Sequence, residues 1–165
     1  MPESELQPRF LTALETLTRY RVEFIVVGAI AAGLEGAISA TEDLDFVYRK
    51  SEENCHRLAA ALESLDARYV DPLNRDIRPT FERLRDLRIS LLKTSLGRLD
   101  ALSEIGPKWN YEALLPRSVE IPLGDVSIRS LGLEAVIEAK EFANRPKDRE
   151  ALPHYRQVLE RRRQG

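Results

Sequence analysis

Residues 24–48 of the chain read FIVVGAIAAGLEGAISATEDLDFVY, and this stretch predicts the fold. It begins with a continuous run of aromatic and β-branched residues, which is typical of a central, buried strand. Gly28 ends that run and opens a segment of small residues, which we expect to form a short helix. A second strand is predicted from Asp43 to Tyr48. The stretch therefore indicates a strand, a helix and a strand, with a glycine at the first junction.

Asp43 and Asp45 stand two residues apart in the second predicted strand. Side chains two positions apart on a strand project from the same face, so the two carboxylates are expected to lie side by side. Adjacent carboxylates repel each other unless water, a base or a cation neutralises them. A hard divalent cation such as Mg²⁺ suits this pair, because it takes oxygen ligands and can hold substrate phosphates through its remaining positions.

Asp100 is the third carboxylate to consider, because it lies between leucines in a predicted strand, where a lone acid requires a partner. One interpretation is an ion pair with Arg98 or Arg88. The other is that Asp100 joins Asp43 and Asp45 in a site for two divalent ions. Two such ions would activate an attacking hydroxyl and neutralise a leaving pyrophosphate. In that scheme Asp100 also takes the proton of the hydroxyl.

Gly28 and Ala29 are predicted to form the start of the short helix. A helix start presents unpaired backbone N–H groups and the positive end of the helix dipole, and these small residues let a phosphate approach the backbone. A plain strand-to-helix turn is the alternative. Lys140 and Lys147 are candidates for binding a triphosphate, with solvated surface lysines as the alternative.

The bulk composition is that of a globular chain of one domain, expected to span residues 1–165, with 43% hydrophobic and 32% charged residues. The formal net charge of −2 predicts no overall attraction to nucleic acid. The segment from Lys140 to Arg163 nevertheless holds eight basic residues against four acidic ones, which could steer a polyanion.

Other features exclude several classes of protein. The single cysteine, Cys55, excludes an intrachain disulfide, and the two histidines lack the spacing of a zinc site. The longest apolar run covers 24–34, only 11 residues, which is too short to cross a bilayer. The acidic, polar N-terminus shows no signal peptide. We therefore expect a cytoplasmic protein without a membrane partner.

The remaining segments complete an α+β prediction, an α/β sandwich in which helices flank a mixed central sheet. The further helices are expected over 2–20, 51–65, 130–142 and 147–163. The further strands are expected over 85–93, 98–103 and, as a pair, 118–129. Ser51 and Ser130 are predicted helix caps. Residues 71–80 are expected to form a loop, and 105–115 to be irregular.

Three motifs carry a family resemblance, and they are Gly28-Ala29, Thr41-Glu42-Asp43-Leu44-Asp45 and Gly97-Arg98-Leu99-Asp100. Their order and spacing resemble the DNA polymerase β-type nucleotidyltransferase superfamily. The C-terminal Ala139-Lys140 and Asn144-Arg145-Pro146-Lys147-Asp148 resemble the small bacterial branch that includes AbiEii-type toxin nucleotidyltransferases. The resemblance covers roughly residues 20–150.

The resemblance implies a nucleotidyltransferase fold and transfer of a nucleoside monophosphate from an NTP such as ATP to an acceptor hydroxyl. It implies two Mg²⁺ ions, with Mn²⁺ as the alternative. The implied catalytic and metal-binding residues are Asp43, Asp45 and Asp100, and the implied nucleotide-binding residues are Gly28, Ala29, Thr41, Lys140 and Lys147. The toxin-like branch implies a tRNA, another RNA or a protein as acceptor, and a cognate antitoxin. The alternatives are a catalytically silent member that binds a nucleotide or a partner protein, and a small-molecule nucleotidyltransferase.

Two residues depart from the superfamily pattern. Ala29 stands where Gly or Ser is usual, so a side-chain contact with phosphate is lost while the backbone contact remains. Ser39 stands where related sequences often carry Arg, which removes one phosphate ligand. Both departures concern the phosphates and leave the three aspartates intact.

Overall fold

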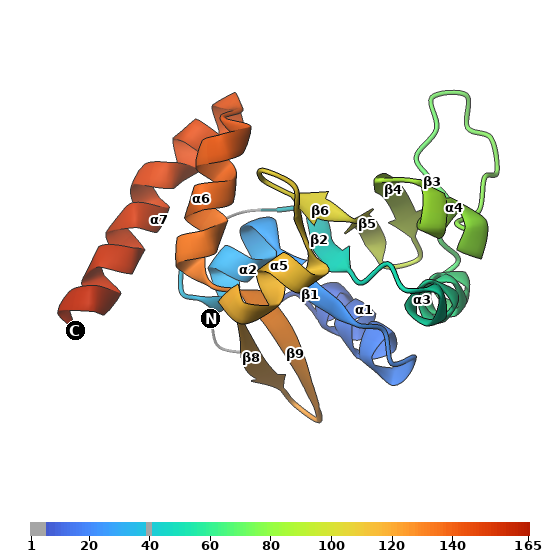
Figure 1. Cartoon of the computed structure of the whole chain (residues 1–165), viewed down its shortest axis with the longest axis horizontal. Coiled ribbons are helices and arrows are strands. Elements are labelled where there is room, and N and C mark those ends of the chain that lie inside the picture. Colours follow the sequence, from blue (N-terminus) through green and yellow to red (C-terminus); the bar gives the residue numbers. More distant parts are fainter. Residues whose placement is uncertain (1–5, 39–40) are drawn as a thin grey trace.

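The computed structural model describes residues 6–38 and 41–165 (Figure 1). Within them, one mixed sheet has the strand order β3-β4-β5-β2-β1-β9-β8. Its strands are β1 (Phe24–Val27), β2 (Asp43–Tyr48), β3 (Arg68–Tyr69), β4 (Ile89–Thr94), β5 (Gly97–Leu102), β8 (Ser118–Leu123) and β9 (Val126–Leu131). A small separate ribbon pairs β6 (Glu104–Ile105) with β7 (Trp109–Asn110).

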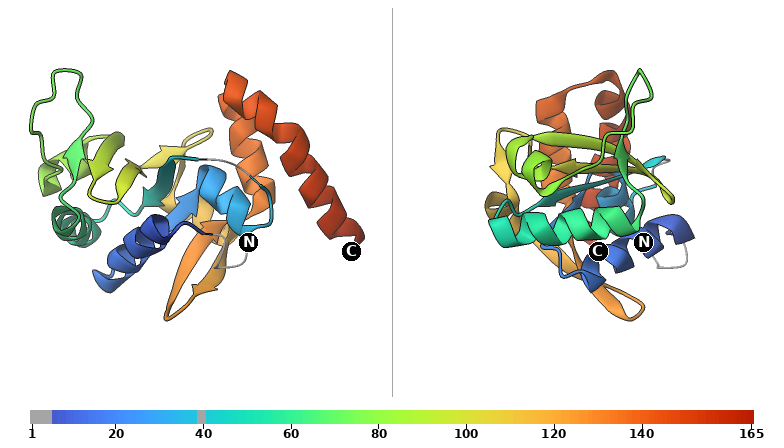
Figure 2. Two further views of the ribbon diagram at one scale, coloured as in Figure 1. Left: turned by 180° about the vertical axis from the view of Figure 1, so that it is seen from behind. Right: turned by 90° about the vertical axis from the view of Figure 1, so that its right-hand side faces the viewer.

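The helices are α1 (Pro8–Arg19), α2 (Gly28–Leu34), α3 (Glu52–Ser64), α4 (Phe81–Asp86), α5 (Tyr111–Leu114), α6 (Leu133–Ala143) and α7 (Pro146–Gln164), with a 3₁₀ turn η2 (Leu115–Arg117). The α6–α7 hairpin stands at one end of the molecule, and the loop after β3 stands at the other (Figure 2). The α+β prediction, with helices flanking a mixed sheet, is confirmed.

Strand β2 lies at the centre of the sheet. One face of the strand is apolar, and the other face is polar. It runs antiparallel to β1 and parallel to β5. Leu44, Phe46 and Tyr48 are all buried on one face. The Tyr48 hydroxyl donates a hydrogen bond of 2.6 Å to the Leu84 carbonyl, which places α4 over this face. The alternation of β2 therefore sends Asp43 and Asp45 to the opposite face.

A buried asparagine joins β1 to the end of β2. Asn54, in the first turn of α3, accepts a hydrogen bond from Glu23 N at 2.7 Å and donates to the carbonyls of Glu23 and Arg49. The predicted cap of this helix is confirmed, because Ser51 Oγ accepts from Asn54 N at 3.2 Å. These bonds satisfy backbone groups at the ends of two central strands.

Three predictions of local structure were wrong in part. Residues 85–88 do not belong to the predicted strand, because α4 extends to Asp86 and is capped by Thr80, whose Oγ1 accepts from Arg83 N. Ser130 does not cap a helix; it is buried inside β9, and α6 begins at Leu133. The segment 105–115, predicted to be irregular, contains β7 and α5.

The first predicted helix appears as α1, and Met1 to Glu5 lie outside the described residues. Among the helices that the structure describes, none has both the length and the apolar character needed to cross a membrane.

The burial of β2 leads to a test of stability. Leu44 lies between the two aspartates and is fully buried, so Leu44→Ala should lower the free energy of unfolding by about 2–5 kcal/mol. Leu91→Ala is the matched control, because Leu91 is 43% exposed and should lose much less. Chemical denaturation of both variants measures the difference. Equal losses would contradict the burial assigned to Leu44.

Candidate active site

The pairing of three strands brings the aspartates together. In the sheet register Asp45 lies opposite Val27 of β1 on one side and opposite Asp100 of β5 on the other. Neighbouring strands are about 4.8 Å apart. The carboxyl groups of Asp45 and Asp100 are close enough to share a hydrogen bond when one of them is protonated. Asp43 lies on the same face, opposite Arg98.

The start of α2 lies directly against Asp45. Gly28 has a φ of +68°, and a Cβ at this position would lie 3.0 Å from Asp45 Oδ2. A side chain here would be strained and would press on the carboxylate. Glycine therefore allows the helix start to approach the carboxylates closely.

Burial and like charge dominate the electrostatics of the site. Burial, the charges of Asp100 and Asp43 and the hydrogen bond with Asp100 together raise the pKa of Asp45 to about 7, and the positive charge of Lys147 opposes the rise. Burial also raises the pKa of Asp100, against the effect of its ion pair with Arg98. Two adjacent buried carboxyl groups that cannot both be charged tend to retain a proton.

The donor atoms fit a hard cation, although the side chains are not arranged around one. In the described part of the chain, Asp45 Oδ1 is buried and has no hydrogen-bond partner. A divalent ion bound by carboxylate oxygens would satisfy that atom. However, within residues 6–38 and 41–165, no group of three or more His, Cys, Asp or Glu side chains is arranged to hold a metal ion. Asp100 instead accepts a hydrogen bond from Arg98 Nη2 at 3.2 Å.

The predicted nucleotide-binding residues fall in different environments. Thr41 Oγ1 accepts from Asp43 N at 3.1 Å and donates to Asp43 O at 3.0 Å, so it fixes the start of β2. Ala29 follows Gly28 in α2. Lys147 is exposed at the start of α7, with its charge acting on Asp45. Ser39 lies outside the described residues.

Lys140 is not free at the site, because it is bound to an aspartate. Its Nζ lies 3.2 Å from Asp148 Oδ1, and Arg145 Nε lies 2.7 Å from Asp148 Oδ2. The Asp148 side chain is fully buried and also accepts from Arg145 N, as part of a capping box at the start of α7. Asp148 therefore fixes the helix start that carries Lys147.

No role for Asp148 or Arg9 was predicted from the sequence. Asp148 did have a local signal. Pro146 marks the first residue of a helix, and an acid at the third position of a helix can form a capping box with the residue before it. Arg9 had no local signal. Its guanidinium occupies the space beside Gly97, where a Cβ would lie 2.5 Å from Nη1, and it pairs with Glu42 at 3.1 Å. It thereby ties α1 to the first residue of β5 and to the residue before Asp43.

Comparisons with known proteins identify the fold. No family model matches the chain, and no curated protein matches it. Among solved structures, the lincomycin-bound lincosamide antibiotic adenylyltransferase LnuA is similar at a TM-score of 0.63 and 13% identity, over 93% of this chain and 98% of that one. The chain has the fold of a nucleotidyltransferase.

A second solved protein shares the fold. The solution structure of the antibiotic-resistance factor ANT(2″)-Ia matches at a TM-score of 0.56 and 16% identity, over 93% of this chain and 84% of that one. Its complex with adenylyl-2″-tobramycin matches at 0.55 and 16%, over 91% and 89%. These likenesses show the fold, and the resemblances to the superfamily and to its AbiEii-type toxins stay predictions.

The raised pKa of Asp45 predicts how stability depends on pH in the metal-free protein. Because the folded state holds this proton up to about pH 7 and an unfolded aspartate loses it near 3.8, stability should fall as the pH rises through this window. Asp45→Asn should therefore raise the melting temperature relative to the natural chain at pH 8 and give a smaller gain at pH 5. Thermal unfolding in EDTA at both pH values measures the difference.

The exposed Asp125→Asn variant is the control and should show the same melting temperature as the natural chain at each pH. If Asp45→Asn changed stability equally at pH 5 and pH 8, the proton assigned to this carboxyl pair would be refuted.

Proposed function

We propose that the protein is a nucleotidyltransferase that uses a divalent metal to transfer NMP from an NTP to an acceptor hydroxyl. The observation that carries the proposal is the in-register placement of Asp45 beside Asp100, next to the start of α2. The proteins with this fold described above include a lincosamide antibiotic adenylyltransferase and a complex with an adenylylated aminoglycoside.

The chemistry divides among the three aspartates. Asp43 and Asp45 would hold Mg²⁺, with Mn²⁺ as the alternative ion, and Asp100 would be a ligand of the second ion. Bound divalent ions neutralise charge on the phosphates and on the leaving pyrophosphate. The acceptor oxygen forms a bond to the α-phosphorus as the bond to the β-phosphate oxygen breaks. Asp100, whose burial raises its pKa, takes the proton from the acceptor hydroxyl.

The nucleotide is proposed to lie on the β1 side of the carboxylates. Its triphosphate would approach the backbone of Gly28 and Ala29, where no bulky side chain blocks it. Lys147 supplies a positive charge close to Asp45. Thr41 and Lys140 contribute by holding the start of β2 and the start of α7, through Asp43 and Asp148.

The acceptor and the biological role are finer proposals. A tRNA, another RNA or a protein as acceptor, a toxin-like role and a cognate antitoxin rest on the sequence motifs. A small-molecule acceptor is the second candidate, supported by the lincosamide and tobramycin named for the structural neighbours. A silent member of the fold would bind an NTP without transferring it, and the Arg98–Asp100 ion pair is the observation that favours this third candidate.

A labelling experiment tests the proposed function. The protein is incubated with each α-labelled NTP, Mg²⁺ and one acceptor, which is total cell RNA, lincomycin or tobramycin. Label should pass to at least one acceptor, and Asp45→Asn and Asp100→Asn should each lower the rate by about 10²-fold or more. Lys147→Gln should raise the KM for the NTP more than it lowers kcat.

Asp125→Asn is the matched control for loss of an exposed carboxylate, and it should retain the full rate. Transfer at equal rates by the natural chain and Asp45→Asn would refute the assignment of the carboxylates. Metal-dependent NTP binding without transfer to any acceptor would favour the silent member.

A further inference from the structure

One face of α7 holds the chain that leaves α2. His154, Val158 and Arg162 recur at intervals of four residues, so they lie along one side of the helix. Each of them lies against the segment 35–38, which follows α2 on the path to β2. We call these three side chains the α7 clamp. In Figure 2 the chain leaves α2 on the side of the molecule where α6 and α7 stand.

Two members of the clamp bind polar groups of the segment, including its backbone. Ile38 N donates a hydrogen bond of 2.9 Å to His154 Nε2. Arg162 Nη1 lies 2.6 Å from Glu35 Oε2 and donates to the Glu35 carbonyl at 3.2 Å. These bonds fix the path of the main chain, which a pair between two side chains alone would not do.

The third member, Val158, packs where α2 ends. Gly36 has a φ of +101°, and the N–H groups of Gly36 and Ala37 donate to the carbonyls of Gly33 and Ala32, as in a Schellman motif. A Cβ on Gly36 would lie 3.9 Å from Val158 Cγ1, so α7 approaches the end of α2 closely. The clamp therefore begins at the last turn of α2 and continues along the chain that follows.

Ile38 depends on His154 for its position. Its side chain is 84% exposed, so apolar packing does not hold it. The bond to His154 Nε2 is the hydrogen bond that the structure gives its N–H group. That bond requires an Nε2 without a proton, because a protonated ring nitrogen can only donate. The Oε1 atom of a glutamine could accept the same bond.

Burial distinguishes the Arg162 pair from two other ion pairs of α7. The Glu35 side chain is 9% exposed, whereas Glu141 and Glu134, the partners of Arg156 and Arg163, are 47% and 63% exposed. Salt screens exposed pairs strongly and buried pairs much less. The pair at the clamp should therefore persist where the exposed pairs weaken.

The clamped segment lies between two parts of the proposed site. It begins at the end of α2, whose first residue, Gly28, lies against Asp45. It leads to Asp43, the first residue of β2. The clamp helix also carries Lys147, whose charge acts on Asp45 and which precedes His154 by seven residues. That spacing is about 10 Å along a helix. One helix thus links the cation near the carboxylates to the segment 35–38.

We propose that the α7 clamp positions the triphosphate site and that His154 is a positioning residue of the reaction. By holding the segment 35–38, the clamp fixes the far end of α2 and the approach to Asp43. The Gly28 backbone, the aspartates and Lys147 then keep one arrangement around the phosphates before the NTP arrives. The proposal rests on the proposed function and adds residues that touch neither phosphate nor metal. Loss of the clamp should weaken NTP binding, because the NTP must then order the site.

Hydrogen exchange of the Ile38 amide, measured by NMR without nucleotide or metal, tests the clamp itself. His154→Leu removes the acceptor, so this amide should exchange about 10-fold faster. His154→Gln should restore slow exchange. Circular dichroism confirms that each variant is folded.

Nucleotide binding tests the positioning role. The probes are analogues of the four NTPs in which a carbon joins the α- and β-phosphates, so that they bind without transferring NMP. They are titrated with Mg²⁺ in a calorimeter. His154→Leu should raise the Kd of the analogue that binds by about 3- to 10-fold, and His154→Gln should restore it. Arg162→Gln should also raise this Kd.

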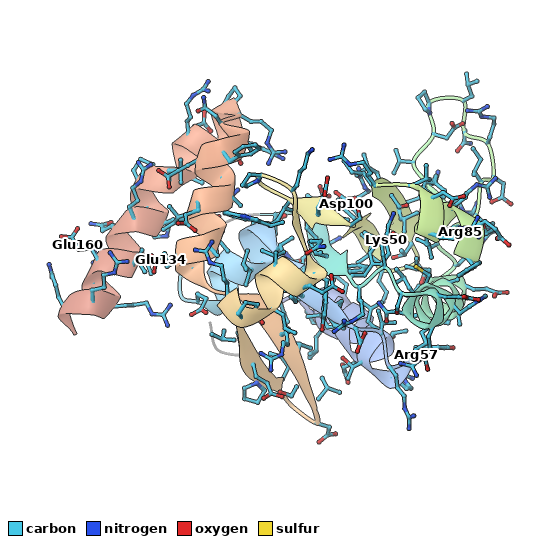
Figure 3. All side chains as sticks on the ribbon, in the orientation of Figure 1. Lys50, Arg57, Arg85, Asp100, Glu134 and Glu160 are labelled. Atoms are coloured by element: carbon cyan, nitrogen blue, oxygen red, sulfur yellow. The ribbon has the colours of Figure 1, made fainter. Side chains whose placement is uncertain are left out.

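Two matched controls make the same substitutions elsewhere. His56→Leu changes the other histidine of the chain, which lies on α3 next to Arg57. Figure 3 shows Arg57 at the opposite side of the molecule from Glu134 and Glu160 of α6 and α7. Arg163→Gln removes an arginine of α7 that pairs with the exposed Glu134. Neither control should change the Ile38 exchange rate or the Kd.

The outcomes separate this proposal from the proposed function. Faster exchange and a raised Kd in His154→Leu, both reversed in His154→Gln, would support the clamp. Unchanged exchange in His154→Leu, no recovery in His154→Gln, or an equal effect of His56→Leu would overturn it. Faster exchange at an unchanged Kd would overturn the positioning role while the proposed function stands. A natural chain that binds none of the analogues would reject the proposed function and, with it, the role of the clamp.

Discussion

The parallel pairing of β2 with β5 imposes the main constraint on this molecule, because it sets Asp45 beside Asp100. Two neighbouring carboxylates that are largely buried destabilise a fold unless a proton or a cation separates their charges. The opposite face of the same strands offsets this cost, since Leu44, Phe46 and Leu99 are buried there. The apolar packing on one side of the sheet thus holds a repulsive arrangement on the other, which is common where a site is organised for function.

Short-range patterns accounted for the central part of the fold. The bounds of β2 were predicted correctly from residues 43–48, and the glycine that begins α2 was predicted from its place after a β-branched run. Both depend on residues near in sequence. The contact between Asp45 and Asp100 depends instead on the register of a parallel pair 55 residues apart, which no local pattern specifies. Asp100 could therefore be nominated from its apolar surroundings but not placed.

The errors have a similar cause. The strand predicted to begin at 85 included the last two residues of α4, because Leu87 continues the alternation of Ile89 and Leu91 toward the helix. Ser130 was taken for a cap because serine commonly is one, but its neighbours make β9 the parallel partner of β1, and tertiary pairing overrode the local preference. Arg9 was missed because its contacts, Glu42 and Gly97, are distant in the sequence.

The arrangement also explains how one small sheet could serve two ligands. Strand β2 separates a side with a glycine and a helix start from a side with exposed side chains on β3 and β4. The first side offers backbone groups, which are constant, and the second offers side chains, which can vary without disturbing the aspartates. Relatives of one fold could in this way keep a shared donor of the transferred group while differing in the molecule that receives it.

The C-terminal helix shows that a count of charges can mislead about a protein's electric field. Asp148 pairs with both Lys140 and Arg145, and further arginines of α7 pair with acids of α6 and with the acidic residue that follows α2. These pairs are Arg156 with Glu141, Arg162 with Glu35, and Arg163 with Glu134. Much of the positive charge near the C-terminus therefore takes part in ion pairs within the chain, and these pairs help to hold α7 against its neighbours. Because salt screens exposed ion pairs, high ionic strength should weaken the pairs of Arg156 and Arg163, while the buried Asp148 keeps the start of α7 in place.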